Sequence, residues 1–304
     1  MTEDSAFFSD KPDTIIPAAS EPVLIHRSEG GWSELYRIDK NGRFRVLKAL
    51  KAEYRGVLRY ETLLRKEFEI GYSLSHTGIC EVYAYVYVHN IGNCIEMEWI
   101  DGVSLSELIE KHRISAEQTK NIVLQLCDTL KYLHAKQVIH RDLKPSNVMI
   151  THNGGHVKLI DFGLSDSDSY TVNKAPAGTH SFASPELFSG SAVDYRTDIY
   201  SLGKLISLMS PDYSAVVRKC TRRNPDERFG SVDEVRESMQ KRRFGFLLPV
   251  ILFVVVAIIA VTYMAYGRDH VVTDTAVDTE FFDPATIDEL FQQATDLIEL
   301  RSDQ

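Results

Sequence analysis

The sequence predicts an α+β protein of two lobes, joined near residues 98–102 and followed by one membrane-spanning helix. Short runs rich in β-branched and aromatic residues precede this junction, and apolar residues at helical spacing follow it. An uncharged run over 244–267 is long enough for a helix to cross a ~30 Å hydrocarbon core. The predicted divisions are a flexible segment over 1–20, a folded domain over 21–240, the spanning helix over 244–267 and a tail over 268–304.

In the first lobe, strands are expected at "EPVLIHR", "SELYRI" and "RFRVLKAL", and a strand pair is expected at "CEVYAYVYVHN" and "NCIEMEWI". Between them, apolar residues at mixed i, i+3 and i+4 spacing indicate a helix around Leu64 and Phe68. In the second lobe, "SAEQTKNIVLQLCDTLKYLHAKQ" opens with Ser115 and carries an apolar stripe, which predicts a long buried helix.

The net charge of −9 is concentrated at one end of the chain. From Asp269 onward, ten acidic residues stand against the single base Arg301, so residues 1–268 sum to zero. A nucleic-acid-binding protein would carry a basic surplus, and we therefore expect no nucleic-acid partner. The four cysteines form no C-x-x-C pair and are expected to be reduced core thiols.

Charges around the uncharged run predict its orientation. "KRR" precedes it and a lone Arg268 follows it, which favours a cytoplasmic N-terminal domain and an extracytoplasmic tail. No apolar stretch occurs near Met1, so no signal peptide is expected. The predicted localisation is the cell membrane, in a single-pass arrangement.

The acidic tail contains a second helical pattern, "FFDPATIDELFQQATDLIEL". Asp283 suits an N-cap and Pro284 the first helical position. An apolar stripe along one face of this amphipathic helix needs a partner. A second copy of the chain would satisfy it and form a homodimer; a loosely ordered tail is the alternative.

Groups suited to phosphoryl transfer gather in "HRDLKPSN", residues 140–147. Asp142 can accept the proton of an attacking hydroxyl, Lys144 can lie near the transferring phosphoryl group, and Asn147 offers an oxygen to Mg²⁺. The apolar run "VKLI" ends at Asp161, whose carboxylate can join a metal ion to phosphate.

"HRDLKPSN", "DFG" and "SPE", in this order, resemble the eukaryotic-type protein kinase family over about residues 21–236. The resemblance implies a bilobal fold, with an antiparallel sheet and one helix (helix C) in the N-lobe and a mostly helical C-lobe. It also implies ATP, Mg²⁺ and protein substrates. Lys144 together with Thr179 is similar to the serine/threonine-specific pattern. Asn147 and Asp161 are the implied metal ligands, and the membrane arrangement resembles that of anchored bacterial kinases.

The resemblance also implies a nucleotide site. Lys48 in "RVLK" would hold phosphates and pair with Glu67, with Glu61 and Glu69 as alternatives. Further implied contacts are Met97 as gatekeeper, the hinge residues Glu98 to Ile100, and Met149 beneath adenine. The phosphate loop departs from the family pattern, because in "SEGGWSEL" only Gly30 falls on a motif glycine. Its implied nucleotide-binding residues are Ser28, Gly30, Gly31, Ser33 and Leu35.

Three more features follow from the resemblance. Glu186 is expected to pair with Arg228, and Asp198 to brace the backbone of "HRDLKPSN", residues 140–147, which is called the catalytic loop below. Arg141 beside Asp142 suggests regulation by phosphorylation of Ser169 or Thr171, with Asp166 or Asp168 as built-in substitutes for the phosphate. The stretch between "IYSLGKLISLM" and "NPDERF" is shorter than the family's usual insert, which predicts a reduced substrate-docking surface.

The predicted function is therefore an ATP-dependent serine/threonine protein kinase that signals at a membrane. The principal alternative is a membrane-tethered pseudokinase that binds ATP as a scaffold without transferring phosphate. A small-molecule phosphotransferase is a third alternative, which "GTHSFASPE" disfavours because such enzymes lack that segment.

Overall fold

The computed structural model describes residues 20–28, 30–111, 113–162, 181–189, 192–241 and 247–269. The chain divides into two compact units, Met1–Arg242 and Arg243–Gln304, which are described separately. Almost all of the predicted N-terminal segment, the phosphorylation candidates and the predicted tail helix lie outside the described residues.

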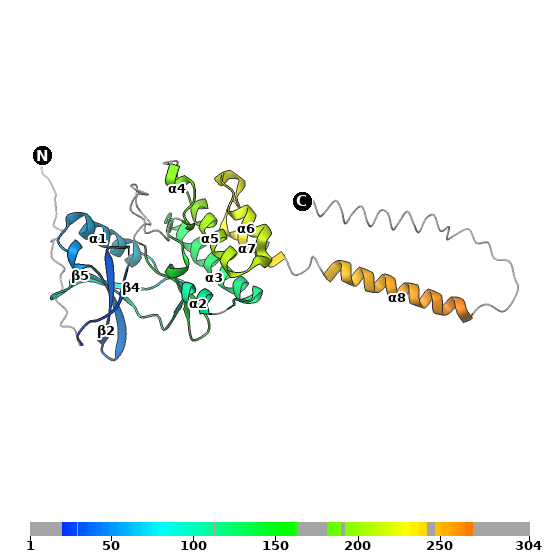
Figure 1. The fold of residues 1–304 in the computed structure, drawn as a ribbon, viewed down its shortest axis with the longest axis horizontal. Coiled ribbons are helices and arrows are strands. Elements are labelled where there is room, and N and C mark those ends of the chain that lie inside the picture. The colour runs from blue at the N-terminus through cyan, green and yellow to red at the C-terminus, as the bar shows by residue number, and fades with distance from the viewer. Residues whose placement is uncertain are drawn as a thin grey trace. The chain divides into compact units, whose positions relative to one another are not determined.

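The first unit contains a strand-rich and a helix-rich part (Figure 1). The strands are β1 (Val23–Arg27), β2 (Ser33–Lys40), β3 (Arg43–Leu50), β4 (Val82–Val88), β5 (Gly92–Glu98), β6 (Gly102–Ser104), β7 (Val148–Thr151) and β8 (Val157–Leu159). The helices are α1 (Leu58–Tyr72), α2 (Leu105–Lys111), α3 (Ala116–Ala135), α4 (Glu186–Ser189), α5 (Arg196–Met209), α6 (Ser214–Cys220) and α7 (Val232–Lys241). Short 3₁₀ turns are η1 (Ala52–Tyr54), η2 (Pro145–Asn147), η5 (Pro211–Tyr213) and η6 (Pro225–Glu227).

The N-lobe is an antiparallel five-stranded sheet in the order β1-β2-β3-β5-β4. Asn41 and Gly42 connect β2 to β3, and both have positive φ, at 57° and 73°. A two-residue hairpin turn with both φ angles positive matches the twist of the flanking strands, which explains the Asn-Gly sequence here. This turn sets the register in which Leu35 lies opposite Lys48.

Helix α1 packs against one face of this sheet through a small apolar cluster. Leu64 of α1 is fully buried against Leu50 of β3 and Ile95 of β5. Aromatic residues surround the cluster, among them Phe68, whose ring lies 5.3 Å from that of Tyr85. The packing fixes how α1 is rotated, and therefore which of its glutamates faces the sheet.

The C-lobe is built around α3, which begins with the predicted cap. The Ser115 side chain accepts from the Gln118 amide, and the Gln118 side chain accepts from the Ser115 amide, forming a capping box. Leu126, Leu130 and Leu133 of α3 are fully buried and pack with Leu202 and Leu205 of α5 in the main core. Gly203 allows α6 to approach closely, because a Cβ there would lie 2.4 Å from the Cys220 Cβ.

A three-stranded sheet, β6-β7-β8, lies where the lobes meet. Leu159 of β8 donates its amide to the Gly78 carbonyl at 2.8 Å and accepts from the Cys80 amide at 2.9 Å. The Ile160 amide donates to the Asn147 carbonyl at 3.0 Å. These backbone bonds tie the residues just before Asp161 to the segment preceding β4 and to the catalytic loop.

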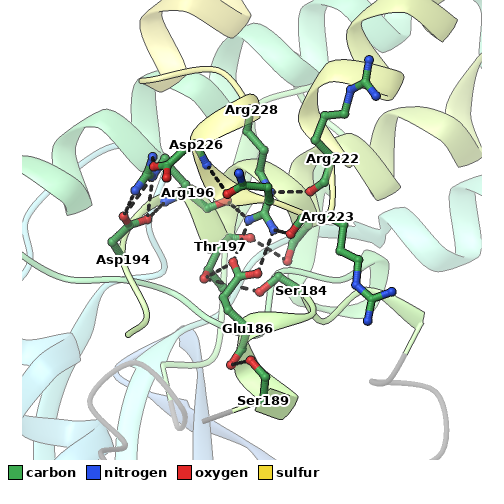
Figure 2. Close-up of polar contacts among 12 residues, drawn as sticks. Ser184, Glu186, Ser189, Asp194, Arg196, Thr197, Arg222, Arg223, Asp226 and Arg228 are labelled. Carbon is green, nitrogen blue, oxygen red and sulfur yellow. Dashed lines mark hydrogen bonds and ion pairs between the residues drawn. The ribbon is translucent and has the colours of Figure 1, made fainter. Parts of the chain in front are cut away.

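Glu186 and Arg228 form a buried ion pair (Figure 2), as the sequence predicted. Arg228 Nη1 and Nη2 donate to the two Glu186 carboxylate oxygens at 2.6 and 2.7 Å. Arg228 also donates to the carbonyls of Arg196, Arg222 and Arg223. Burial alone would raise the Glu186 pKa, but hydrogen bonds from Arg228 and Thr197 lower it below its usual value.

The second unit contains α8 (Leu247–Asp269). Its described side chains, over 252–263, are all exposed, and all but three are large and apolar. Among the helices in the described part of the chain, none has the combination of length and hydrophobicity needed to cross a membrane.

We expect Arg228→Met to lower the free energy of unfolding by about 3–5 kcal/mol, because it leaves the buried Glu186 carboxylate unpaired. Urea denaturation of the variant and the wild type measures this difference. Arg196→Met is the matched control: Arg196 pairs with Asp194 and with Asp226, whose side chain is 79% exposed. We expect that change to cost no more than about 1 kcal/mol. Equal losses in both variants would contradict the assignment.

Candidate active site

Three charged side chains from separate elements, Lys48, Glu67 and Asp161, form one cluster. Lys48 Nζ, on β3, lies 2.5 Å from Glu67 Oε1 of α1 and 3.0 Å from Asp161 Oδ1, two residues beyond β8. The Lys48 and Glu67 side chains are only 6% and 4% exposed, whereas that of Asp161 is 38% exposed. Asp161 is thus the member of the cluster that faces open space.

Helix rotation selects Glu67 among the three glutamates considered for this pair. Glu61 instead accepts from the Gly56 amide and from Asn93 Nδ2. Glu69 forms an exposed i, i+4 pair with Arg65. Glu67 is the one of the three that lies on the same side of α1 as the buried Leu64, facing the sheet.

Burial and opposite charge compete within this cluster. Burial by itself lowers the pKa of Lys48, but the Asp161 and Glu67 carboxylates outweigh it and raise this pKa above its usual value. Burial raises the pKa of Glu67, and the Lys48 ammonium only partly opposes the rise. The cluster therefore keeps a positive ammonium group next to the more exposed carboxylate of Asp161.

The catalytic loop places Asp142, Lys144 and Asn147 within hydrogen-bonding distance of one another. Lys144 Nζ lies 2.7 Å from Asp142 Oδ2, and Asn147 Nδ2 donates to the same oxygen at 3.0 Å and to the Asp142 carbonyl at 2.9 Å. Both donors bind the same carboxylate oxygen of Asp142, Oδ2. The other, Oδ1, is buried and has no hydrogen-bond partner among the residues that the structure describes. Asp142 Oδ1 is therefore an oriented acceptor for an incoming donor.

The surroundings of Asp142 favour its role as an acceptor. Burial raises the pKa of this carboxyl above its usual value, and the Lys144 ammonium opposes the rise. A carboxylate with a raised pKa is a better proton acceptor than a fully solvated one.

Asp198, at the start of α5, anchors the catalytic loop by its backbone. Its carboxylate accepts from the amides of His140 at 3.0 Å and Arg141 at 2.9 Å. The Asp198 side chain is fully buried, and His134 Nε2 lies 2.9 Å from its Oδ2. Burial would raise the pKa of Asp198, but the His134 hydrogen bond and the surrounding donors lower it below its usual value.

Left-handed backbone occurs at two positions beside these groups. Arg141 has φ 63° and Asp161 has φ 70°. Such angles are uncommon for residues with a Cβ and persist where surrounding bonds over-determine the conformation. For Arg141, the bond from its amide to Asp198 supplies one such constraint. The turn at Arg141 directs Asp142 toward Lys144 and Asn147.

The predicted adenine-contacting residues line the junction of the lobes. Met97, the residue before the last in β5, borders a small cavity with Glu67, Asp161 and Phe162. Met149 of β7 pairs with Ser104 and Lys158. The Glu98 carboxylate binds Lys158 at 2.7 Å, its amide donates to the Glu81 carbonyl, and its carbonyl accepts from Cys80 Sγ at 3.8 Å. Ile100, two residues further along the hinge, is partly buried.

The phosphate loop is braced by the residues that replace its glycines. Ser28 Oγ accepts from the Gly31 amide at 3.0 Å, and Ser33 lies at the start of β2, opposite Leu50. A Cβ at Gly31 would lie 2.3 Å from Ser28 Oγ, so the position of the Ser28 hydroxyl depends on glycine here. Gly30 is exposed. Leu35, two residues further along β2, is partly buried opposite Lys48.

Sequence reasoning missed Trp32 in this loop. Lys48 Nζ lies 5.5 Å from the centroid of the Trp32 ring, which also packs near Tyr60 of α1. The aromatic residue in "GGWSEL" was the available signal. The structure also places His134 on Asp198, a contact that no motif in the sequence specifies. Glu29, Thr179 and the phosphorylation candidates lie outside the described residues.

Oxygen donors suited to a divalent cation are present at Asn147 and Asp161. Asn147 uses its Nδ2 within the loop, which leaves its amide oxygen as a possible ligand, and Asp161 exposes its carboxylate. Within the described residues, no group of three or more His, Cys, Asp or Glu side chains could hold a metal ion. A site with few protein ligands suits Mg²⁺, which retains water and takes further oxygens from phosphates.

Comparisons with known proteins agree with this geometry. The model of the protein kinase domain family matches residues 28–212. A probable serine/threonine-protein kinase of Streptomyces coelicolor, SCO3848, is 31% identical over 72% of this chain and 39% of its own length. The serine/threonine-protein kinase PknB of Mycolicibacterium smegmatis is 28% identical, over 69% of this chain and 41% of its own. The chain thus spans about two fifths of each of these relatives.

The crystal structure of the Mycobacterium tuberculosis PknI kinase domain shares the fold, with a TM-score of 0.57 and 23% identity. It covers 72% of this chain, and the match extends over 94% of that domain. Because the family model matches more than half of the chain, the chain belongs to the protein kinase domain family. The predicted bilobal fold is confirmed.

We expect Asp198→Asn to lower the free energy of unfolding by about 2 kcal/mol or more at pH 7, because an amide cannot accept all the donors that the carboxylate holds. The Asp198 pKa is lowered in the fold, so its stabilisation is complete above the unfolded value of about 3.9 and is lost as pH falls through the folded pKa. Urea denaturation at pH 7 and near pH 3 should therefore show the difference shrinking in acid. Asp101→Asn, at an exposed position, is the control; a pH-independent difference for Asp198→Asn would contradict the argument.

Proposed function

We propose that this chain is an ATP-dependent serine/threonine protein kinase anchored in a membrane. One observation carries the enzymatic proposal: the Lys48–Glu67–Asp161 cluster and the Asp142–Lys144–Asn147 loop occur together in one folded unit. The Ile160–Asn147 backbone bond joins the two sets directly. Cations for phosphate, oxygen donors for a metal and an oriented proton acceptor are the groups that phosphoryl transfer requires.

In the proposed reaction, a serine or threonine hydroxyl oxygen attacks the γ-phosphorus of ATP. The bond from this phosphorus to the β–γ bridging oxygen breaks, ADP leaves, and the hydroxyl proton passes to Asp142 Oδ1. Lys48 holds the nucleotide phosphates, while Lys144 binds the phosphoryl group in transfer. The buried surroundings of Asp142 strengthen these electrostatic contacts.

Asn147 and Asp161 would hold the Mg²⁺ that accompanies ATP. Bound Mg²⁺ supplies charge neutralisation at the phosphate oxygens. Lys48 keeps Asp161 in place through its 3.0 Å ion pair, and the Asp142–Asn147 bond orients the amide.

The preference for serine and threonine rests on two supports. Lys144 follows Asp142 at the spacing of the serine/threonine pattern, and the relatives named above are serine/threonine-protein kinases.

A pseudokinase scaffold is the second candidate. It is favoured by the Ser28–Gly31 bond, which stiffens the phosphate loop, and by Trp32 beside Lys48.

We expect the full chain to transfer phosphate from MgATP to a protein substrate, and Asp142→Asn to reduce the rate by about 10²–10⁴, because the proton acceptor is lost. Lys48→Met should also abolish most transfer, because it removes the ammonium group that binds the nucleotide phosphates. Transfer of ³²P measures both effects.

Asp212→Asn and Lys131→Met, at exposed positions away from the site, serve as controls and should leave the rate unchanged. Nucleotide binding by the wild type with no transfer under any condition would establish the scaffold in place of the enzyme.

Membrane anchoring is supported by the uncharged sequence over 244–267, which extends beyond the described side chains of α8 at both ends. It is also supported by the exposure of apolar side chains all around α8, from Leu252 to Val261. A helix that is apolar on every side needs a nonaqueous environment. The basic "KRR" favours a cytoplasmic kinase domain and an outer tail.

We expect the full chain to remain in the membrane fraction after an alkaline carbonate wash. Val255→Lys combined with Ile259→Lys should release it, because each lysine costs about 2.5–3.5 kcal/mol at the centre of a spanning helix. Val23→Lys combined with Ile25→Lys, on exposed strand β1, is the matched control. Retention of the α8 variant in the membrane would contradict the anchor.

The tail helix is proposed to pair with a second copy of the chain. Its apolar stripe, which includes Ile287, Leu290 and Phe291, supports this partner, and its acidity disfavours an anionic membrane surface. Sedimentation in detergent tests the proposal, which fails if deletion of residues 280–304 leaves the oligomeric state unchanged.

A further inference from the structure

Glu34, the second residue of β2, carries a buried carboxylate that has no part in the proposed reaction. Its side chain is only 1% exposed. Within the described residues, three side chains donate to it: Arg27 Nη2 at 3.0 Å, Arg55 Nη2 at 2.6 Å and the Tyr36 hydroxyl at 2.6 Å. A charge buried this deeply is tolerated only when it is paired, so it constrains where its partners lie.

Glu34 lies on the face of the sheet opposite to Lys48. Leu35 pairs with Lys48 across the two strands, so their side chains share a face, whereas Glu34 pairs with Ala49. Successive residues of a strand point to opposite faces, so the Glu34 carboxylate points away from the phosphate-binding lysine. Glu34 nevertheless belongs to the phosphate loop "SEGGWSEL". Any effect on nucleotide binding must therefore act through the backbone of that loop.

Arg55 extends this constraint to the strand that carries the lysine. Arg55 follows η1 in the connection between β3 and α1. Its Nε donates to the Leu50 carbonyl at 2.9 Å, and its Nη1 donates to the Asn90 carbonyl at 2.8 Å. Leu50 is the last residue of β3, two residues beyond Lys48. One planar guanidinium, with donors in fixed directions, therefore joins Glu34 to the end of β3 and to the turn before β5.

Two further contacts lie beside this connection. The Lys51 amide donates to the Trp32 carbonyl at 3.0 Å, which joins the loop to the residue after β3. Arg27, the last residue of β1, lies opposite Glu34 across the loop and donates to its other carboxylate oxygen. The Arg27 side chain is 59% exposed, against 27% for Arg55. A solvated ion pair contributes little, so Arg55 is the partner that should set the position of the loop.

We propose that Glu34, acting through Arg55, is a positioning residue that holds the phosphate loop at a fixed separation from Lys48, so that both bind the same nucleotide phosphates. The proposal rests on the proposed kinase function. A site held in its binding conformation avoids the cost of ordering the loop when the nucleotide binds. The loop would contact ATP in the ground state and in the transition state alike, so loss of this order should raise the KM for ATP and leave kcat nearly unchanged.

The test compares Glu34→Gln with the wild type, as full chains in nonionic detergent. The amide keeps the shape and removes the charge-assisted bond to Arg55. The KM for ATP should rise about tenfold, with kcat within about twofold. Glu96→Gln is the matched control, because Glu96 lies in the same sheet, is 3% exposed and pairs with Lys40 at 2.9 Å. Urea denaturation should show similar losses of stability in both variants. An equal rise in KM in both would overturn the proposal.

The two arginines provide a second comparison. Arg55→Gln should raise the KM for ATP about as much as Glu34→Gln, and the double variant should add less than about twofold, because the two residues act as one unit. Arg55→Lys, which keeps the charge, should recover part of the loss. Arg27→Gln should change the KM less than about twofold. Equal effects of the two arginine variants, or additive effects of Glu34→Gln and Arg55→Gln, would overturn the role of Arg55.

Trp32 gives a readout that needs neither nucleotide nor catalysis. The chain has two tryptophans, Trp32 in the phosphate loop and Trp99 in the hinge. In a Trp99→Phe background, the remaining fluorescence comes from a ring that is partly buried, 6.5 Å from Tyr60 of α1. Glu34→Gln should raise the acrylamide quenching constant of this ring about twofold or more, because the loop opens more often. Glu96→Gln should leave it unchanged. Unaltered quenching in Glu34→Gln would overturn the proposal.

Binding of methylanthraniloyl-ATP separates this proposal from the kinase assignment. If the wild type binds this nucleotide and transfers no phosphate, the kinase assignment fails, and a Kd about tenfold higher in Glu34→Gln than in Glu96→Gln still supports the positioning role. A lower kcat in Glu34→Gln with unchanged KM and Kd would overturn that role, because the residue would then act on the chemical step. Absence of nucleotide binding by the wild type would overturn both.

Discussion

The buried ammonium of Lys48 is the constraint on which the rest of the catalytic unit depends. A charge with 6% exposure is tolerated only when it is paired, and its two partners come from α1 and from the segment after β8. Pairing therefore requires the sheet, the helix and the end of β8 to be in place together. If α1 moved away, Glu67 and Lys48 would each lose a partner at buried positions. The same ion pairs that position the phosphate-binding lysine thus hold the N-lobe to the element that carries Asp161.

The C-lobe repeats this arrangement with a buried carboxylate at its centre. Lys48 binds side chains, whereas Asp198 binds the backbone amides of the catalytic loop. Asp198 therefore fixes the position of the loop without restricting the side chains of residues 140 and 141. It also helps to hold the left-handed turn at Arg141. As a result Asp142 meets Lys144 and Asn147 through one oxygen and leaves the other available. Local backbone strain and an unsatisfied acceptor occur together where a substrate hydroxyl is proposed to lie.

Strong local signals made much of this architecture predictable. The Ser115 cap and the apolar stripe predicted α3, and the alternating runs predicted β2, β3, β4 and β5 within a few residues. Asp142, Lys144 and Asn147 lie within six residues of sequence, so their proximity follows from one short loop. The pairing partner of Lys48 was harder to predict, because Glu61, Glu67 and Glu69 lie on one helix. Only the packing of Leu64 against Leu50 and Ile95 determines which of them faces the sheet.

The sequence by itself determined the family, the two lobes and the identity of the charged groups, because each is encoded in a short motif or a local periodicity. It also determined the separation of charge between a neutral kinase unit and an acidic tail. The tertiary structure decided the features that combine distant segments: Trp32 beside Lys48, His134 in contact with Asp198, and the backbone bonds that join Leu159 to Gly78 and Cys80. These depend on contacts between residues far apart in the chain, and no local pattern specifies which distant side chains will meet.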